Sequence, residues 1–246
     1  MESHNKYIIR ENVALTEAVF RMTLQGSTER IVRAGQFVNI ALPGRFLRRP
    51  ISVCDYDDNS ITLIYKILGL GTAQMSTMQP GTTLDVLTGL GNGFNTDVPC
   101  CQPLLVSGGV GLPPLYGLTK RLLQCGKQPH LVMGFNTAND IFYLDEFRNL
   151  GLDVYVATID GSSGFKGLVT DAIAAASLSF DYLYACGPLL MLRALSCFEV
   201  DGQLSLEQRM GCGFGACMGC SVETTHGYKR ICTEGPVLQK NEIIWK

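Results

Sequence analysis

Four cysteines near the end of the chain constrain its fold more than any other feature. Cys212, Cys217, Cys220 and Cys232 follow the spacing C-x4-C-x2-C-x11-C, and the first three lie in the glycine-rich stretch MGCGFGACMGC. Three thiolates from one loop and a fourth from a nearby strand can surround a compact two-iron core, and this is the plant-type [2Fe-2S] spacing. The glycines let backbone N–H groups approach the sulfurs and stabilise their negative charge. The pattern therefore predicts a [2Fe-2S] cluster.

Two other uses of four cysteines are open at this point, a structural zinc site and a pair of disulfides. Structural zinc sites usually combine two C-x2-C pairs, and only Cys217 and Cys220 have that spacing. The first residues, MESHNKYIIRENVAL, lack the basic and then apolar pattern of a secretory signal. This predicts a cytoplasmic location, where disulfides are rare. The iron–sulfur interpretation is favoured over both alternatives.

The remaining cysteines are predicted to serve packing rather than ligation. Cys54, Cys125 and Cys197 lie in apolar strand or helix patterns, which predicts buried thiols. Cys100 and Cys101 fall at a proposed domain boundary, and the sequence gives them no role.

The composition argues against two classes of partner. Charged residues make up 17% of the chain, the formal net charge is -2, and no basic run occurs, so no nucleic-acid partner is predicted. No apolar segment approaches the ~20 residues of a membrane span, so no membrane partner is predicted. A chain of 246 residues is long enough for one large domain or two to three small ones.

The pattern of apolar residues changes twice along the chain, which predicts three closely packed domains. Residues 1–98 hold short apolar or alternating runs separated by turn-rich pieces, a pattern typical of an antiparallel β-barrel. Residues 99–205 alternate apolar strands with helix-like segments, which predicts an α/β domain with a parallel sheet. Residues 206–246 return to short glycine-rich segments around the four cysteines, which predicts a small ferredoxin-like domain.

Two turns in the α/β region have the composition of phosphate-binding turns. SGGVGLPP, with Gly108, Gly109 and Gly111, joins a buried strand to an amphipathic helix with proline near its first turn. ACGP, which contains Cys186, is a second strand-to-helix turn. Ligands of open parallel sheets bind beyond the carboxyl ends of the strands, where both turns should lie. Either turn alone is consistent with plain chain reversal, but the two together predict a dinucleotide site.

In the β-rich region, RRPIS and GLGT are weaker candidates for phosphate binding. An arginine just ahead of a strand can pair with a pyrophosphate, and Ser52 can hydrogen-bond a flavin. The GLGT segment can offer backbone N–H groups to the same phosphates. On the residues alone, solvated surface charge is the simpler interpretation of RRPIS.

Taken together, these pieces resemble a known family. RRPISVCD, IYKILGLGT, TLDVLTGLGNGF, LLVSGGVGLPPL, DGSSGFKGLVTD, YACGP and the final cysteine segment with YKRICTEGPVL cover the chain almost end to end. In this order they resemble the ferredoxin-NADP reductase superfamily, a flavin barrel followed by a nucleotide domain. Within it they are most similar to the electron-transfer subunits of class 1B dihydroorotate dehydrogenase.

The resemblance implies which residues bind each cofactor. The four cysteines would bind the [2Fe-2S] cluster. The nicotinamide nucleotide would lie across Gly108, Gly109 and Gly111, with the Cys186 turn near the nicotinamide. FAD would be held by nine residues of the barrel region: Arg49, Pro50, Ile51, Ser52, Ile64, Tyr65, Lys66, Gly71 and Thr72.

The resemblance also implies an activity and a partner. Electrons from dihydroorotate would pass from the FMN of a separate catalytic subunit through [2Fe-2S] and FAD to NAD, in pyrimidine biosynthesis. Such subunits usually form a heterotetramer of two plus two. NAD is favoured over NADP because the segment GFNTANDIF offers Asp140 and no basic residue for a 2′-phosphate. No general base is needed for hydride transfer to flavin, so no catalytic residue is predicted.

Two alternative functions stay open from the sequence. One is a flavin/[2Fe-2S] subunit that serves another acceptor, as in ferredoxin:NADP or sulfide-linked oxidoreductases. The other is a zinc-stabilised binding module without enzymatic activity.

Overall fold

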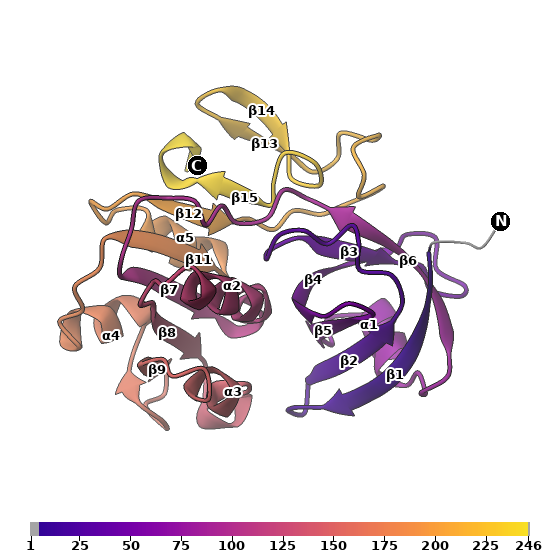
Figure 1. The fold of residues 1–246 in the computed structure, drawn as a ribbon, viewed down its shortest axis with the longest axis horizontal. Helices are drawn as coiled ribbons and strands as arrows, with labels where there is room; N and C mark the ends of the chain where they lie inside the picture. The colour runs from indigo at the N-terminus through magenta and orange to yellow at the C-terminus, as the bar shows by residue number, and fades with distance from the viewer. Residues whose placement is uncertain (1–4, 246) are drawn as a thin grey trace.

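A computed structural model describes residues 5–245 and arranges them in three packed units. Figure 1 shows a strand barrel on the right, a sheet flanked by helices on the left, and the C-terminal segment lying across the top of both. The predicted multidomain fold, with a β-barrel, an α/β unit and a small cysteine-containing C-terminal unit, is confirmed.

Within residues 5–245, the first six strands close into an antiparallel barrel in the order β1-β2-β5-β4-β3-β6. Its interior is filled by apolar side chains that alternate with outward-facing ones, as the two-residue period of a strand requires. A short helix, α1 (Leu70–Ser76), follows β5 and begins inside the GLGT segment. The barrel strands are β1 (Lys6–Ala14), β2 (Val19–Gln25), β3 (Phe37–Ile40), β4 (Arg49–Tyr56), β5 (Ser60–Lys66) and β6 (Thr83–Leu90).

The α/β unit is built on a sheet of seven strands in the described chain, in the order β10-β9-β8-β7-β11-β12-β15. All neighbours are parallel except β12 and β15. Helices α2 and α3 pack on one face and α4 and α5 on the other. The strands are β7 (Pro103–Gly108), β8 (His130–Phe135), β9 (Val154–Thr158), β10 (Phe165–Lys166), β11 (Tyr182–Cys186), β12 (Gly202–Ser205) and β15 (Val237–Gln239). The helices are α2 (Pro113–Gln124), α3 (Leu144–Arg148), α4 (Val169–Ala175) and α5 (Leu189–Leu195), with short 3-10 turns η1 (Gly109–Gly111), η2 (Ala138–Asp140) and η3 (Lys240–Glu242).

Helix α2 joins the barrel to the sheet. Leu115, Leu118 and Leu122 recur at helical spacing, are fully buried, and share one core with residues of both the barrel and the sheet. On the helix surface, Gly117 lies so close to β4 that an added Cβ would be 2.9 Å from the backbone oxygen of Cys54. The absence of a side chain at Gly117 therefore sets how closely the two units approach.

The C-terminal unit carries a hairpin of β13 (Ser221–Thr224) and β14 (Gly227–Arg230), and then returns to the sheet through β15. The segment predicted as a separate domain, 206–246, thus contributes one strand, β15, to the sheet of the α/β unit. Asn92, at the end of the barrel, fixes this return: its Nδ2 donates to the carbonyl oxygen of Val237 at 2.7 Å, and its Oδ1 accepts from the Val237 N–H at 3.1 Å.

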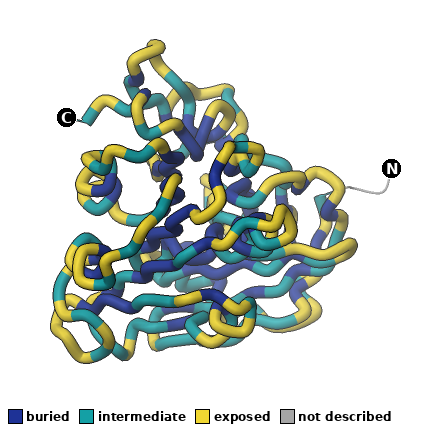
Figure 2. The backbone as a smooth tube through the Cα atoms, turned by 60° about the vertical axis from the view of Figure 1, so that its left-hand side comes forward, coloured by how far each residue is buried: buried dark blue, intermediate teal, exposed yellow. Residues whose placement is uncertain are grey.

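The distribution of burial corrects one prediction about the cysteines. Figure 2 shows buried strands inside the molecule and exposed turns around it. Cys54 is buried as predicted, but Cys125 and Cys197 are exposed, so that prediction was wrong for both. Cys125 is the residue at the C-terminal cap of α2, and Cys197 lies two residues after the end of α5. Both therefore lie beyond the buried apolar face of their helix. Among the described residues, no helix is both long enough and apolar enough to cross a membrane.

Substitution of Leu118 should weaken the packing between the barrel and the sheet and so lower the stability of the protein. We expect Leu118→Ala to lower the free energy of unfolding by about 2–5 kcal/mol, because it leaves a cavity in the core shared by the two units. Arg121→Ala, on the exposed side of the same helix, is the matched control. Chemical denaturation followed by circular dichroism measures both, and equal midpoints for the two variants would contradict this account of the core.

Candidate functional site

The four predicted cluster ligands lie in two pairs. Cys212 and Cys217 belong to the loop between β12 and β13, and the backbone N–H of Cys212 lies 3.4 Å from the Cys217 sulfur. The second pair is Cys220, at the end of this loop, and Cys232, just after β14; the Cys232 N–H lies 3.4 Å from the Cys220 sulfur. The fold therefore brings together residues that are 12 positions apart in the second pair.

Pairing of this kind fits a two-iron cluster better than a single metal ion. In the part of the chain that the structure describes, no three side chains of the His, Cys, Asp or Glu type gather closely enough to hold one ion. A structural zinc ion needs four ligands around one point. In a [2Fe-2S] cluster, each iron takes two of the four protein ligands. The two pairs present four thiols, which is the number of protein ligands that a [2Fe-2S] cluster takes, so the residues present fit that group.

Backbone N–H groups around the loop favour thiolate at its first cysteine. Partial burial alone would raise the pKa of Cys212, but hydrogen bonds from Phe214, Cys217 and Ala216 lower it to about 6. The Ala216 N–H, for example, lies 3.2 Å from the Cys212 sulfur. Burial, together with the neighbouring Cys220 thiol, raises the pKa of Cys232 to about 11. Bound iron would offset the negative charge of these sulfurs and so favour the thiolate form of both pairs.

The loop backbone has a conformation that few residues adopt. Gly213 and Gly215 have φ of +78° and +95°, and Met218, between two of the cysteines, has φ of 59°. A side chain with φ in this region costs of order 1 kcal/mol or more and is retained where the surrounding structure fixes it. Arg230 of β14 contributes to this by donating from Nη1 to the Gly215 carbonyl oxygen at 2.8 Å.

The predicted FAD residues of β4 and α1 converge on the side chain of Arg49. A Cβ added to Gly71 would be 2.0 Å from Arg49 Nε, so only glycine permits this contact. Arg49 Nη1 donates to the carbonyl oxygen of Leu47 at 2.6 Å, and Arg49 forms no ion pair with a carboxylate of residues 5–245. Thr72 Oγ1 accepts hydrogen bonds from the backbone N–H groups of Leu68 and Gly69. An unneutralised guanidinium beside a glycine turn fits a bound pyrophosphate.

The other predicted FAD residues differ in which way they face. Ile64 lies in the core between barrel and sheet, near η1, whereas Tyr65 points into the barrel, where burial raises its pKa and its hydroxyl donates to Asn12 Oδ1 at 2.9 Å. The Tyr65 side chain is thus occupied inside the barrel, and any contact of Tyr65 with FAD would come from its backbone. Pro50 is exposed, and Ile51, Ser52 and Lys66 are partly buried.

The two glycine-rich turns of the α/β unit lie against each other. β7 and β11 are parallel neighbours, and the register places Cys186 beside Ser107. A Cβ added to Gly111 would be 2.2 Å from the backbone oxygen of Cys186, and one on Gly108 would be 2.6 Å from Pro188 Cδ. Both turns therefore lie at the carboxyl edge of the sheet, as predicted, while Gly109 has open space at its Cα.

Two polar groups at this edge bear on what can bind there. Ser107 Oγ is buried and has no hydrogen-bond partner among the residues described, which leaves donor and acceptor capacity at the position expected for a ligand. Burial and, secondly, the charge of Glu207 raise the pKa of Cys186 to about 12, so its thiol is neutral at physiological pH. The nicotinamide ring is neutral in NADH and positively charged in NAD⁺, and a neutral thiol repels neither form.

The carboxylate of Asp140 is partly committed to its own turn. Its Oδ2 accepts from the Thr137 N–H at 3.2 Å and from the Thr137 hydroxyl at 3.3 Å, which caps η2. If Asp140 selects NAD over NADP by accepting a hydrogen bond from the ribose, as predicted, its free oxygen Oδ1 would be the acceptor.

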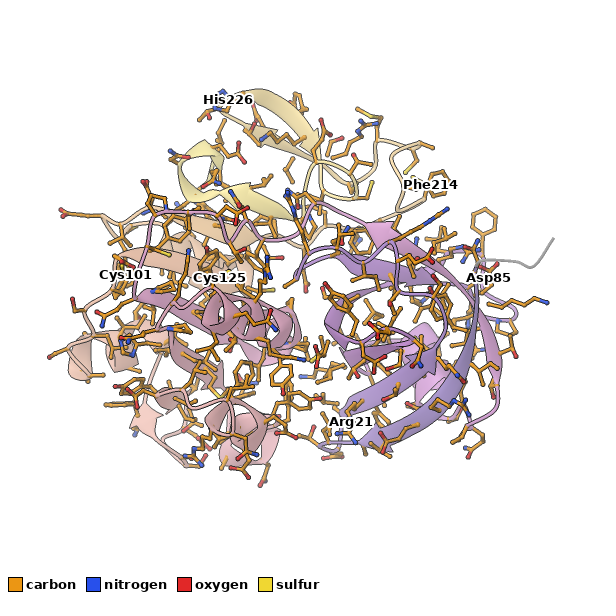
Figure 3. The ribbon with its side chains drawn as sticks, viewed as in Figure 1. Arg21, Asp85, Cys101, Cys125, Phe214 and His226 are labelled. Carbon is orange, nitrogen blue, oxygen red and sulfur yellow. The ribbon has the colours of Figure 1, made fainter. Side chains whose placement is uncertain are left out.

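Sequence reasoning missed the side chains that hold the cluster loop from outside. Arg230 reaches the loop from the hairpin, and Asn39 of β3 donates from Nδ2 to the Cys212 carbonyl oxygen at 3.1 Å. Figure 3 shows the loop, marked by Phe214, projecting above the barrel. One sequence signal was available for Asn39: it is the single polar residue in the buried strand FVNI.

Comparison with known protein families identifies two segments of the chain. The iron–sulfur cluster binding domain of dihydroorotate dehydrogenase B matches residues 207–244, which contain all four cysteines. The oxidoreductase NAD-binding domain matches residues 105–196, which contain both glycine-rich turns. The predicted iron–sulfur and NAD-binding character of these two segments is confirmed.

Comparison with whole proteins extends the similarity to the barrel. The chain is 42% identical over 257 residues to the electron transfer subunit of dihydroorotate dehydrogenase B (NAD(+)) from Geobacillus sp. (strain WCH70), covering 99% of both chains. It is 40% identical over 259 residues to the subunit of the same name from Bacillus cereus (strain G9842), again with 99% of both chains covered.

Solved structures agree on the fold. An NADH-dependent reduced ferredoxin-NADP oxidoreductase, studied for flavin-based electron bifurcation, superimposes with a TM-score of 0.89 at 31% identity, over 100% of this chain and 92% of that chain. A ferredoxin NADP+ reductase from Neisseria gonorrhoeae, solved with FAD and NADP, gives a TM-score of 0.66 at 16% identity, over 76% and 87% of the two chains. At that identity the second comparison supports the fold alone.

The geometry at Arg49 generates a test of the flavin site. We expect Arg49→Gln to weaken FAD binding by about 10- to 100-fold, because a charge-assisted hydrogen bond to a phosphate is worth roughly 1.5–3 kcal/mol. Titration of flavin-free protein with FAD, followed by flavin fluorescence, gives the dissociation constant. Arg10→Gln, on an exposed position of β1, is the matched control, and equal affinities for the two variants would exclude Arg49 from the site.

Proposed function

The chain belongs to the family of dihydroorotate dehydrogenase B electron transfer subunits, and from this premise we propose that it passes electrons between NAD and the FMN of a separate catalytic subunit, through a [2Fe-2S] cluster and FAD. The near full-length identity to such subunits carries the proposal, together with two cysteine pairs beside a flavin-type barrel. The physiological direction is from dihydroorotate to NAD, in pyrimidine biosynthesis.

The protein's part in this reaction is to bind and orient. When bound, FAD exchanges a hydride with NAD and single electrons with the iron–sulfur cluster, so it connects a two-electron carrier to a one-electron carrier. Cys212, Cys217, Cys220 and Cys232 would hold the cluster. Arg49 and the α1 turn would hold the pyrophosphate of FAD, and the Gly108 to Gly111 turn would hold NAD.

The packing of α2 against the barrel supports hydride transfer by fixing the orientation of the two units. The carboxyl edge of the sheet adjoins the barrel because η1 contacts β5, so the NAD turn lies beside the predicted FAD strand. No acid or base is required at this joint, and the neutral Cys186 thiol at the edge is consistent with that requirement.

The proposed partner is the catalytic subunit that the family name implies. We propose that this subunit carries FMN, oxidises dihydroorotate and forms a heterotetramer of two plus two with this chain. A second candidate acceptor follows from the similarity, at 31% identity and a TM-score of 0.89, to the NADH-dependent reduced ferredoxin-NADP oxidoreductase: a complex in which ferredoxin or NADP takes part in place of dihydroorotate.

One experiment distinguishes the two candidates. The chain is co-expressed with a candidate FMN subunit, the complex is purified, and dihydroorotate-dependent reduction of NAD is assayed. We expect activity in the complex and none in the FMN subunit alone with NAD. Reduction of NAD by the FMN subunit without this chain would refute the proposed role. A complex that reduces ferredoxin or NADP, but not NAD from dihydroorotate, would support the second candidate.

Loss of one cluster ligand should abolish the activity that needs the cluster and leave part of the activity that needs only FAD. We expect Cys217→Ser to abolish cluster absorbance and the dihydroorotate-dependent reduction of NAD by the complex, while FAD and part of the NADH-to-dye activity persist. Cys101→Ser, an exposed cysteine outside the predicted ligand set, is the control. Visible absorbance with iron and sulfide analysis measures the cluster, and a Cys217→Ser protein with full absorbance would show that the ligand assignment is wrong.

A further inference from the structure

Strand β3 separates the interior of the barrel from the cluster unit. Val38 points inward and packs in the barrel core. Phe37, on the opposite face, belongs to the core that includes Cys220 and Cys232. Asn39 lies on the same face as Phe37, two residues further along, and is only 1% exposed. The outward face of β3 is thus the surface on which the cluster unit rests.

Asn39 makes a direct contact with a predicted cluster ligand across this surface. Its Nδ2 donates to the carbonyl oxygen of Cys212 at 3.1 Å, and Gly213 (φ +78°) makes room, since an added Cβ there would be 2.3 Å from Asn39 Nδ2. Arg48 Nη1 lies 3.3 Å from the Asn39 carbonyl oxygen, and Arg48 is itself held by Asp85 at 2.9 Å. Arg48 and Asp85 therefore fix the backbone of Asn39 on the barrel side of this contact.

The amide of Asn39 has no polar partner within the barrel. Its Oδ1 is buried and lacks a hydrogen-bond partner among residues 5–245, so the bond to Cys212 is the one its side chain makes there. A buried amide with an unmet acceptor costs free energy that an apolar side chain of the same size would not. The hydrogen bond to the cluster loop therefore explains why a polar side chain occupies position 39, and no contact within the barrel does.

The strand register places this contact beside the predicted FAD segment. Asn39 pairs with Pro50 of β4, and Phe37 pairs with Ser52. Residues directly opposite each other in an antiparallel pair point to the same face, with Cβ atoms ~4.5–5.5 Å apart. Two predicted FAD residues and the two residues that contact the cluster unit therefore form adjacent columns on one surface.

We propose that Asn39 is a positioning residue that fixes the Cys212 end of the cluster loop relative to the FAD-binding strand, and so sets the separation across which electrons pass. The inference rests on the proposed function, because it requires both cofactors. Asn39 would thus act in the electron relay although it is not among the residues predicted to bind either cofactor.

The test compares two substitutions in the full chain with both cofactors bound. Asn39→Leu removes the amide at nearly the same size, and Asn39→Asp keeps the shape but replaces the donor with an acceptor. Rapid mixing with NADH follows bleaching of FAD and of the cluster separately. We expect cluster bleaching to slow in both variants while FAD bleaching keeps its rate, because a released Cys212 end of the loop would lie farther from the FAD-binding strand. The expected factor is about fivefold, which corresponds to the ~1 kcal/mol of one net hydrogen bond that holds this end in place. Loss of the cluster to an iron chelator should quicken by about the same factor.

Asn92→Leu is the matched control, because Asn92 also ties the cluster unit to the rest of the chain but bonds to Val237 rather than to a cluster ligand. We expect it to lower thermal stability without changing the ratio of the two bleaching rates. Wild-type bleaching rates and chelator sensitivity in both Asn39 variants would overturn the inference, and so would equal effects of Asn39→Leu and Asn92→Leu. A wild-type protein that binds no cluster or no FAD would instead overturn the proposed function.

Discussion

The close approach of α2 to β4 is the contact on which the rest of the arrangement depends. Neither the barrel nor the sheet carries a complete redox site, because the predicted FAD residues lie on the barrel and the NAD turns on the sheet. Gly117 lets the helix backbone approach β4, and a single apolar core continues from the barrel through α2 into the sheet. A continuous apolar interface of this kind fixes the orientation of the barrel relative to the sheet. Hydride transfer depends on that orientation and needs no acid or base.

A second interface uses a different principle. The outward face of β3 meets the cluster unit through one aromatic side chain, Phe37, and one amide, Asn39. Apolar packing fixes the approach of two surfaces but allows small shifts along them, whereas a hydrogen bond is directional. The combination is suited to a loop whose backbone holds Gly213, Gly215 and Met218 at positive φ, since such a conformation is kept where surrounding contacts fix it.

Features that depend on residues close in sequence were predictable here. The cysteine spacing, the turns around Gly108 and Cys186, and the helical leucine stripe of α2 each depend on fewer than about 25 consecutive residues, and the barrel and parallel sheet followed from their periodicity. The contact between Asn39 and Cys212 joins residues 173 positions apart, and the packing of Gly71 on Arg49 depends on a helix that the sequence did not suggest. Cys125 and Cys197 were misplaced because an apolar pattern does not specify where a short helix leaves the core.

The two interfaces place different geometric demands on the chain. FAD and NAD must meet in one geometry for a hydride to pass, so the α2 joint tolerates little variation. The cluster unit exchanges single electrons, and its β15 strand anchors it to the sheet independently of the ligand loop. Asn39 and β15 therefore hold the cluster unit at two separate places, while Phe214 and Met218 of the loop are exposed. The fold shared at a TM-score of 0.89 with an oxidoreductase that is 31% identical covers 100% of this chain, so the similarity includes the cluster unit and both of its attachments.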